Sequence, residues 1–496
     1  MILAVPPVVR PLLRLALALA LLPAAGALAG GTADSDAGRA GALPAGVSAA
    51  LEQAGVADAG SAFVALPLDG GPLRLSRHAD IPMNPASTMK LLTTYVALAT
   101  LGPNYRWHTQ ALARRPVTGG RLDGDLIVRG GGDPSLVIER WWLLVERLRA
   151  LGIREIRGDL VLDRSRYALA PDAGATLDGN ELRPYNVAPD ALLINFRALA
   201  ITFVPDHAGA TARVALTPPM DGLRMPTQVH VTDGPCGDWH ARLKADFSRP
   251  LAPVFHGSYP RACGEKTWYV SPLPPDEYAL ASFRALWRAG GGIFRGSVRE
   301  GVAGPEARVL ADLESPPLAE VIRDINKNSN NVMARQLFLT LGAAADTRQD
   351  SLGEPARDTP ASVDRSISRV QSWLAEQGLA MPELVLQNGS GLSRQERISA
   401  ASLARLLTLA WNGNEMPNFL ASLPLAGVDG TMKDRQVAPG AAYVKTGTLA
   451  EVRALAGYVF AASGRRYAVV ALINDPHAEA AQAAHDAFLE WVWREG

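Results

Sequence analysis

A serine and a lysine stand three residues apart in this chain, in a segment that reads Pro85-Ala86-Ser87-Thr88-Met89-Lys90. Only six of the 49 basic side chains are lysines, and the others are arginines. An arginine stays protonated at any working pH, whereas a lysine amine can lose its proton when it is desolvated or lies beside another cation. The spacing therefore predicts a nucleophilic serine, Ser87, whose proton is taken by Lys90.

A single Ser-x-x-Lys pair is weak evidence, because random placement gives roughly 0.3 such pairs in a chain of this composition. The plain alternative is a surface serine and a surface lysine one helical turn apart. The flanking residues favour a site: Asn84 is a good N-cap, Pro85 suits the first helical position, and 89–98 predicts a buried helix. Ser87 would then lie in the first turn, where free N–H groups stabilise negative charge.

A second segment carries Ser329 and Asn331 at the start of a helix-like run over 332–339. Taken alone, Ser-x-Asn is a very weak signal, and a simple N-cap is the alternative that we favour for it. It gains weight only from its position between the first segment and a third one nearer the C-terminus.

The third segment, 441–449, predicts a β-strand, and two further apolar runs after it predict an antiparallel meander. A glycine inside a strand marks either a bulge or the close approach of another backbone or a ligand. The polar residues of this strand are Lys445, Thr446, Gly447 and Thr448. Three such segments in this order, each on a suitable element, together predict one catalytic site.

The three segments resemble the motif set of the penicillin-recognising serine acyltransferases. Four longer stretches, 124–136, 183–186, 388–394 and 445–449, are similar to those of the class C low-molecular-mass penicillin-binding proteins. These are D-alanyl-D-alanine carboxypeptidase/endopeptidases of the penicillin-binding protein 4 type, and the similarity extends from about residue 46 to near the C-terminus. Asn388 stands where we expect aspartate at least as often, which leaves the role of the 388–394 loop open.

This resemblance implies catalytic roles for four side chains. Ser87 is expected to attack the carbonyl of the penultimate D-Ala, and Lys90 is expected to accept its proton. Ser329 would relay the proton to the leaving amine, and Asn331 would orient Lys90 and the substrate amide. The expected reaction needs no metal and no organic cofactor.

The resemblance also implies how the substrate is held. The substrate-binding residues are expected to be Lys445, Thr446, Gly447 and Thr448, of which the first two bind the terminal carboxylate. The backbone N–H groups of Ser87 and Thr448 are expected to form the oxyanion hole. The expected partners are peptidoglycan peptides, as D-Ala-D-Ala termini and cross-links, and β-lactam antibiotics that acylate Ser87.

The N-terminus predicts an exported protein. Arg10 and Arg14 precede an apolar run over 15–22, and small residues at 27–29 suit cleavage, so 1–29 is predicted to be a signal peptide. An uncleaved anchor is the alternative, although the apolar core is short for a membrane span. The expected location is the periplasm or another exported compartment, and peripheral membrane association is left open. The formal net charge of zero, with dispersed basic residues, argues against nucleic acid as a partner.

The two cysteines, Cys236 and Cys263, are expected to form a disulfide in that oxidising compartment. A zinc site is excluded because two cysteines lack partner histidines at ligand spacing.

Ser87 and Ser329 lie much farther apart in sequence than Ser329 and Lys445, and the resemblance interprets the excess as an insertion. The predicted fold is an α/β (α+β) one, like that of the transpeptidases and serine β-lactamases, with an antiparallel sheet and a helix cluster. Its helical stretches are expected near 318–341, 363–377 and 401–411. The serine peptidase domain is predicted to be discontinuous, 30–103 and 276–496, around a β-rich insertion, 104–275, made of two nested modules.

Two other functions are compatible with parts of this pattern. A β-lactamase shares the motif set, but the long insertion and the peptidase-like flanking stretches argue against it. A non-catalytic wall-binding protein would keep the fold and lose a nucleophile, whereas every motif residue is present here.

Overall fold

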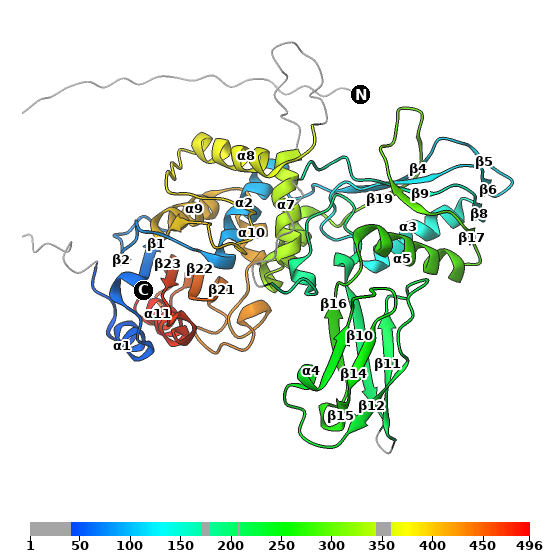
Figure 1. Cartoon of the computed structure of the whole chain (residues 1–496). Coiled ribbons are helices and arrows are strands. Elements are labelled where there is room, and N and C mark those ends of the chain that lie inside the picture. The colour runs from blue at the N-terminus through cyan, green and yellow to red at the C-terminus, as the bar shows by residue number, and fades with distance from the viewer. Residues whose placement is uncertain (1–40, 170–178, 207–208, 344–358) are drawn as a thin grey trace, which may run out of the picture. The chain divides into compact units, whose positions relative to one another are not determined.

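The computed structural model describes residues 41–169, 179–206, 209–343 and 359–496 (Figure 1). The expected signal peptide lies outside these residues. The fold combines helices with mainly antiparallel sheets, which confirms the predicted α+β class. Within the described ranges, no helix is both long and apolar enough to cross a membrane.

The catalytic region is built on a five-stranded antiparallel sheet of strand order β2-β1-β23-β22-β21. Its strands are β1 (Ser61–Pro67), β2 (Leu75–Arg77), β21 (Ala442–Leu449), β22 (Val452–Phe460) and β23 (Arg466–Asn474). Strands β21 to β23 are the meander expected from the sequence. Strand β1 pairs with β23 over its whole length, so the two ends of the chain meet in one sheet.

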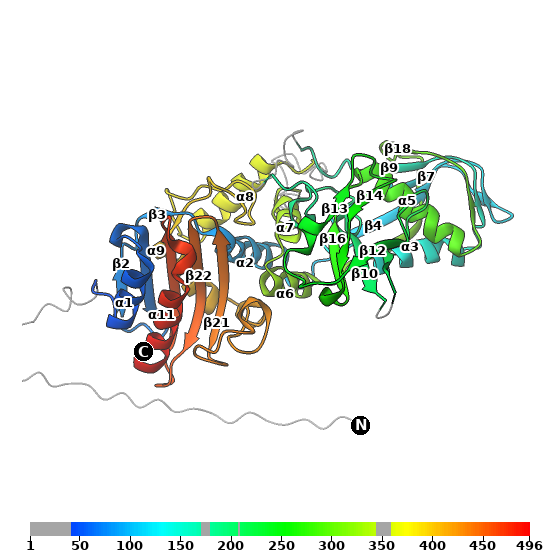
Figure 2. The same cartoon turned by 60° about the horizontal axis from the view of Figure 1, so that its bottom comes forward.

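Side chains alternate between the two faces of this sheet, as the period of a strand requires. On one face, Phe63 and Val469 pack with Phe488 of α11 (Gln482–Glu495), and α1 (Ala45–Ala54) completes that layer. Figure 2 shows α11 against the strands on this side. On the other face, Val64 and Val470 belong to the core that the helix cluster closes.

The helix cluster contains the motif-bearing helices. Its members are α2 (Met89–Leu101), α6 (Leu318–Asn328), α7 (Asn331–Ala343), α8 (Val363–Glu376), α9 (Ala400–Asn412) and α10 (Met416–Ser422). The single stretch expected at 318–341 is two helices, because Ser329 has a left-handed backbone, with φ of 54°. A short ladder of β3 (Pro82–Met83) and β20 (Ile398–Ser399) lies beside this cluster in sequence and space.

The inserted region contains two sheets that share helices α3 (Ile138–Ala150) and α5 (Pro275–Ala289). The larger sheet has the order β18-β9-β7-β4-β19. Its strands are β4 (His108–Ala113), β7 (Leu126–Arg129), β9 (Leu160–Asp163), β18 (Val298–Glu300) and β19 (Arg308–Glu314). The smaller sheet joins β5 (Val117–Thr118), β6 (Arg121–Leu122), β8 (Glu155–Ile156) and β17 (Ile293–Phe294).

A further five-stranded sheet of order β15-β12-β11-β10-β16 lies within the insertion. Its strands are β10 (Leu199–Pro205), β11 (Thr211–Thr217), β12 (Gln228–Thr232), β15 (Tyr259–Pro260) and β16 (Lys266–Val270). The hairpin of β13 (Leu243–Asp246) and β14 (Val254–Gly257) and the single-turn helix α4 (Trp239–Arg242) accompany it. Cys236 and Cys263 form a disulfide with an S–S distance of 2.04 Å in this part.

Asp276, where the sequence predicts the end of the insertion, lies inside a helix that packs with the preceding sheets. That residue lies in the first turn of α5, whose Tyr278, Phe283 and Trp287 are buried in the core of the insertion. Strand β19 then pairs with β4, so residues up to Glu314 complete the inserted sheet. The sequence-based boundary was placed where the β-like runs end. One helix, α5, and three strands, β17, β18 and β19, follow that point before residue 315. We therefore propose that the inserted region ends near Glu314.

Candidate active site

A short 3-10 turn, Ala86–Thr88, carries Ser87 and leads into α2. Ala86 has a left-handed backbone with φ of 43°, a conformation that an L-residue keeps only when its surroundings hold it. Asn84 supplies that support: its Oδ1 accepts the Ala86 N–H at 2.9 Å, and its Nδ2 donates to the Ser393 carbonyl at 2.8 Å. The sequence predicted that Asn84 caps the helix. Its side chain instead holds the turn that precedes α2.

Lys90 lies in the first turn of α2 and is fully buried, with 0% of its surface exposed. Its Nζ lies 2.8 Å from Ser87 Oγ and 2.6 Å from Asn331 Oδ1. Burial lowers the pKa of Lys90 well below its usual range, and the positive charge of Lys445 lowers it further, whereas Glu396 opposes this shift. Burial and the neighbouring cation thus favour loss of the Lys90 proton, and the amine lies within hydrogen-bond distance of the serine hydroxyl.

Ser329 lies at the break between α6 and α7, where its left-handed backbone ends α6. Its Oγ accepts a hydrogen bond from Lys445 Nζ at 2.8 Å. Asn331 begins α7, so the same break places both side chains of the second motif beside the two lysines. The serine is thus not the N-cap that we favoured for an isolated Ser-x-Asn pattern.

Lys445 lies on β21, and none of its surface is exposed. Besides Ser329, its Nζ donates to the carbonyl of Thr446 at 2.6 Å. Burial lowers the pKa of Lys445 to about 7. Thr446 Oγ1 lies 2.8 Å from Thr431 Oγ1, and Thr448 is exposed further along the same strand.

Strand β21 approaches the Ser87 turn so closely that position 447 admits no side chain. A Cβ atom there would lie 2.7 Å from the Ser87 backbone nitrogen and 3.0 Å from the Pro85 carbonyl oxygen. Gly447 is therefore a point of close backbone approach, which is one of the two interpretations left open by the sequence. The approach brings the backbone of the third motif against that of Ser87.

The loop over 387–396 supplies contacts that the motif analysis missed. The carbonyl of Ser390 accepts a hydrogen bond from Lys90 Nζ at 2.5 Å. Buried Glu396 holds the loop, because its Oε1 accepts backbone N–H groups of Gln387, Asn388 and Gly389 at 2.9–3.1 Å. The glycines of this segment signal a tight turn, but sequence alone does not show which carbonyl points at the amine.

Direct hydrogen bonds join Lys90 to Ser87 and Asn331, and a separate hydrogen bond joins Lys445 to Ser329. Lys445 is near enough for its charge to lower the pKa of Lys90. Thr446, Gly447 and Thr448 follow on the adjoining strand. Within the described part of the chain, no group of three or more His, Cys, Asp or Glu side chains is arranged to hold a metal ion. The arrangement can deprotonate a serine hydroxyl and hold an anionic group beside it.

Comparison with known proteins agrees with this chemistry. The model of the D-Ala-D-Ala carboxypeptidase 3 (S13) family matches residues 43–494. The D-alanyl-D-alanine carboxypeptidase DacB of Haemophilus influenzae is 27% identical over 83% of this chain and 85% of its own length. The D-alanyl-D-alanine carboxypeptidase of Actinomadura sp. strain R39 is 28% identical over 91% of this chain and 84% of its own length.

Solved structures give the same result for the fold. The crystal structure of penicillin binding protein 4 (dacB) from Haemophilus influenzae matches with a TM-score of 0.73 and 24% identity, covering 90% of this chain and 99% of that one. The same protein complexed with a novel β-lactam matches with a TM-score of 0.70 and 25% identity over the same shares.

Proposed function

The chain belongs to the D-Ala-D-Ala carboxypeptidase 3 (S13) family, and from this premise we propose how its residues cleave peptidoglycan peptides. The protein is a serine hydrolase of the D-alanyl-D-alanine carboxypeptidase and endopeptidase type. We propose that it acts on stem peptides and on cross-links through an acyl-enzyme on Ser87. The observation that carries this proposal is the buried amine of Lys90, 2.8 Å from Ser87 Oγ.

In the acylation step, the hydroxyl of Ser87 donates its proton to the neutral amine of Lys90 as Oγ bonds to the carbonyl carbon of the penultimate D-Ala. Asn331 Oδ1 and the Ser390 carbonyl then accept hydrogen bonds from the ammonium that forms. The C–N bond breaks as the proton that Lys90 accepted passes through the Ser329 hydroxyl to the leaving amine, which leaves Lys90 neutral again. In the second step, a water molecule gives a proton to Lys90 as its oxygen bonds to the same carbon. The C–Oγ bond then breaks, and that proton passes to Ser87.

Charge in the transition state is stabilised by the backbone. The close approach of β21 at Gly447 supports an oxyanion hole formed by the N–H groups of Ser87 and Thr448. Lys445 and Thr446 bind the carboxylate of the terminal D-Ala, and the same pair binds the carboxylate of a penicillin. This division gives the two buried lysines opposite tasks: Lys90 works without its proton, and Lys445 works with it.

The enzyme is related to cell-wall carboxypeptidases, and we propose a periplasmic location after removal of residues 1–29. Peripheral association with the membrane stays a prediction. A sedimentation assay of the exported protein with membranes, at low and high salt, measures it directly.

Labelling with a fluorescent penicillin tests the proposed nucleophile. The wild-type protein is expected to carry one adduct, located on the peptide that contains Ser87, and Ser87→Ala is expected to carry none. Ser463→Ala, in an exposed turn between β22 and β23, is the matched control and should label like wild type. An adduct that persists in Ser87→Ala would show that another residue is the nucleophile.

Digestion of purified cross-linked peptidoglycan separates this function from its two rivals. Mass spectrometry should find loss of terminal D-Ala, cleaved cross-links, or both. Rapid turnover of a chromogenic cephalosporin, without peptide products, would indicate a β-lactamase. Absence of any covalent β-lactam adduct would indicate a binding protein.

A further inference from the structure

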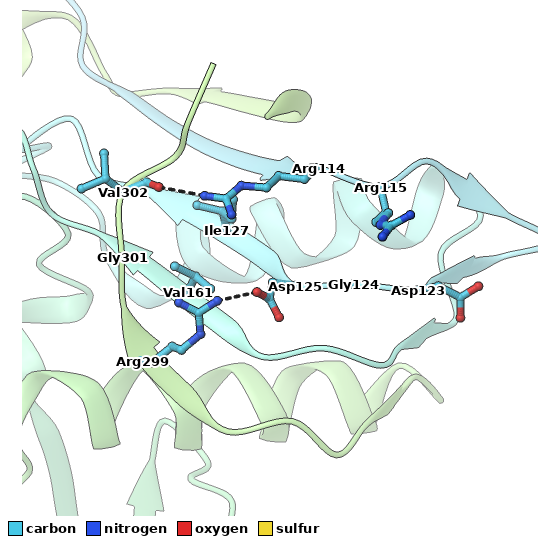
Figure 3. A pocket seen from close by; sticks show the side chains of 10 residues that line it. All are labelled: Arg114, Arg115, Asp123, Gly124, Asp125, Ile127, Val161, Arg299, Gly301 and Val302. Carbon is cyan, nitrogen blue, oxygen red and sulfur yellow. Dashed lines mark hydrogen bonds and ion pairs between the residues drawn. The ribbon is translucent and has the colours of Figure 1, made fainter. Parts of the chain in front are cut away.

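A hollow of about 360 Å³ lies on the inserted sheet, at the end of β4 (Figure 3). Its floor is formed by Ile127 of β7 and Val161 of β9. Their sequence neighbours Leu126 and Leu160 are buried in the core with α3 and α5, so alternation along each strand directs the floor residues to the opposite face. The hollow is therefore on the side of the sheet away from those helices.

The carboxylates of the hollow already have cationic partners. Asp125 forms an ion pair with Arg299 at 2.5 Å, and Asp123 lies 2.9 Å from Arg121. Asp123 also lies 3.3 Å from Arg157. These carboxylates are thus neutralised by arginines that do not include the two at the end of β4.

Those two arginines, Arg114 and Arg115, are exposed and carry unneutralised charge. Arg114 Nη2 donates to the Val302 carbonyl at 3.3 Å, as the dashed line in Figure 3 shows. Arg115 has no side-chain hydrogen bond and no ion pair within the described ranges, and Figure 3 shows its guanidinium by itself near the rim. The hollow therefore presents two exposed guanidinium groups, of which that of Arg115 has no partner within the described residues.

A neighbouring hollow of about 550 Å³, which shares Val302, serves as an internal comparison. There Arg129 lies 3.2 Å from Asp163, and Arg106 lies 3.7 Å from Glu314. These two arginines are already paired with carboxylates, so their positive charge is less available to bind an anion. The smaller hollow is the better anion site despite its size.

We propose that this hollow binds the free carboxylate of a second peptide arm of peptidoglycan and so anchors the polymer away from Ser87. This inference rests on the proposed function. A guanidinium pairs with a carboxylate through two parallel N–H···O bonds, which suits the free terminal carboxylate of a peptide arm. A polymer with many arms gains binding from a second site by raising the local concentration of arms at the first.

The test compares a polymer with a small substrate. Arg115→Glu should raise the KM for purified sacculi, measured as D-Ala release, about three- to tenfold through loss of one charge-assisted contact. Arg115→Gln should give a smaller increase in the same direction. Acylation by fluorescent penicillin and cleavage of a soluble D-Ala-D-Ala tripeptide should stay within about twofold of wild type.

The matched control is Arg213→Glu, an exposed arginine on β11 of another sheet, which should leave both KM values unchanged. An unchanged KM for sacculi in Arg115→Glu, or equal losses on sacculi and tripeptide, would overturn the anchoring role. Sedimentation with phosphatidylglycerol vesicles distinguishes a phosphate headgroup: loss of vesicle binding with intact binding to sacculi would assign the hollow to lipid and also overturn it. Failure of wild type to accept penicillin would refute the proposed function instead.

Discussion

Replacing Lys90 by arginine separates positive charge from proton acceptance. The Lys90 amine is enclosed, with Ser87 Oγ, Asn331 Oδ1 and the Ser390 carbonyl around it. An arginine there would keep its proton at any working pH, so Ser87 would lose the group that activates it. The change keeps a cation in place and removes only the capacity to accept a proton, apart from the greater bulk of the side chain.

The expected loss follows from the role of a general base. Removing one costs about 10²–10⁴-fold in rate, which corresponds to roughly 3–5 kcal/mol of activation free energy. Lys445→Arg is the matched comparison, because Lys445 is equally buried and pays a similar cost in packing. Its proposed task is to bind a carboxylate, which an arginine also performs, so we expect a loss of about tenfold or less.

Stopped-flow acylation of both variants with one fluorescent penicillin measures the difference, and thermal melting of each shows that it is folded. Lys90→Arg should be slower than Lys445→Arg by at least about tenfold on these grounds. Equal losses, or the reverse order, would mean that Lys90 is not the proton acceptor and that another group activates Ser87.

Three further predictions follow from the same geometry. Because burial lowers the pKa of Lys445 to about 7, its cation is present below that pH and lost above it, so the KM for a D-Ala-D-Ala peptide should rise as pH increases through 7, and Lys445→Arg should abolish this rise. Gly447→Ala would place a Cβ 2.7 Å from the Ser87 nitrogen, so the Ser87 turn must shift, and acylation by fluorescent penicillin should fall about 10²-fold in protein that is still folded; an unchanged rate would refute the close approach. Breaking the Cys236–Cys263 disulfide, whose cysteines are 27 residues apart, should lower the free energy of unfolding of the insertion by about 3 kcal/mol while penicillin labelling continues; two free thiols per unreduced chain would rule the bond out.

The sequence was most informative where chemistry restricts the choice of residue. A lysine in a chain that otherwise uses arginine, three residues after a serine, indicated the proposed nucleophile, and the residues at 441–449 predicted the strand that approaches it. Both features are local, because a helical turn and a strand each follow from a few consecutive residues. The pairing of these segments with Ser329 and Asn331 needed the resemblance to a known family.

The features of the site that the sequence did not predict depend on contacts between residues that are distant in the chain. Ser329 was expected to begin a helix, but the chain turns there through a left-handed residue whose hydroxyl accepts from Lys445. Of the adjacent Trp141 and Trp142, only Trp141 is buried, whereas Trp142 is 49% exposed, a difference that two identical neighbouring residues do not show in the sequence. Glu396 is fully enclosed and organises a loop beside Lys90, a role that no spacing rule assigns.

The pairing of β1 with β23 sets the order in which the protein can be assembled. Strand β1 is made early in synthesis, but the partner that flanks it is residues 466–474, almost the last part of the chain. The inserted sheets close earlier, since β7 and β9 pair over a short sequence separation. As the chain emerges in the exported compartment, the insertion can therefore fold before the catalytic sheet is complete. The Ser87 turn meets β21 only at the end, so the enzyme stays without activity until its C-terminal strands have emerged, and a chain shortened before Ala442 would be a folded insertion on an inactive peptidase.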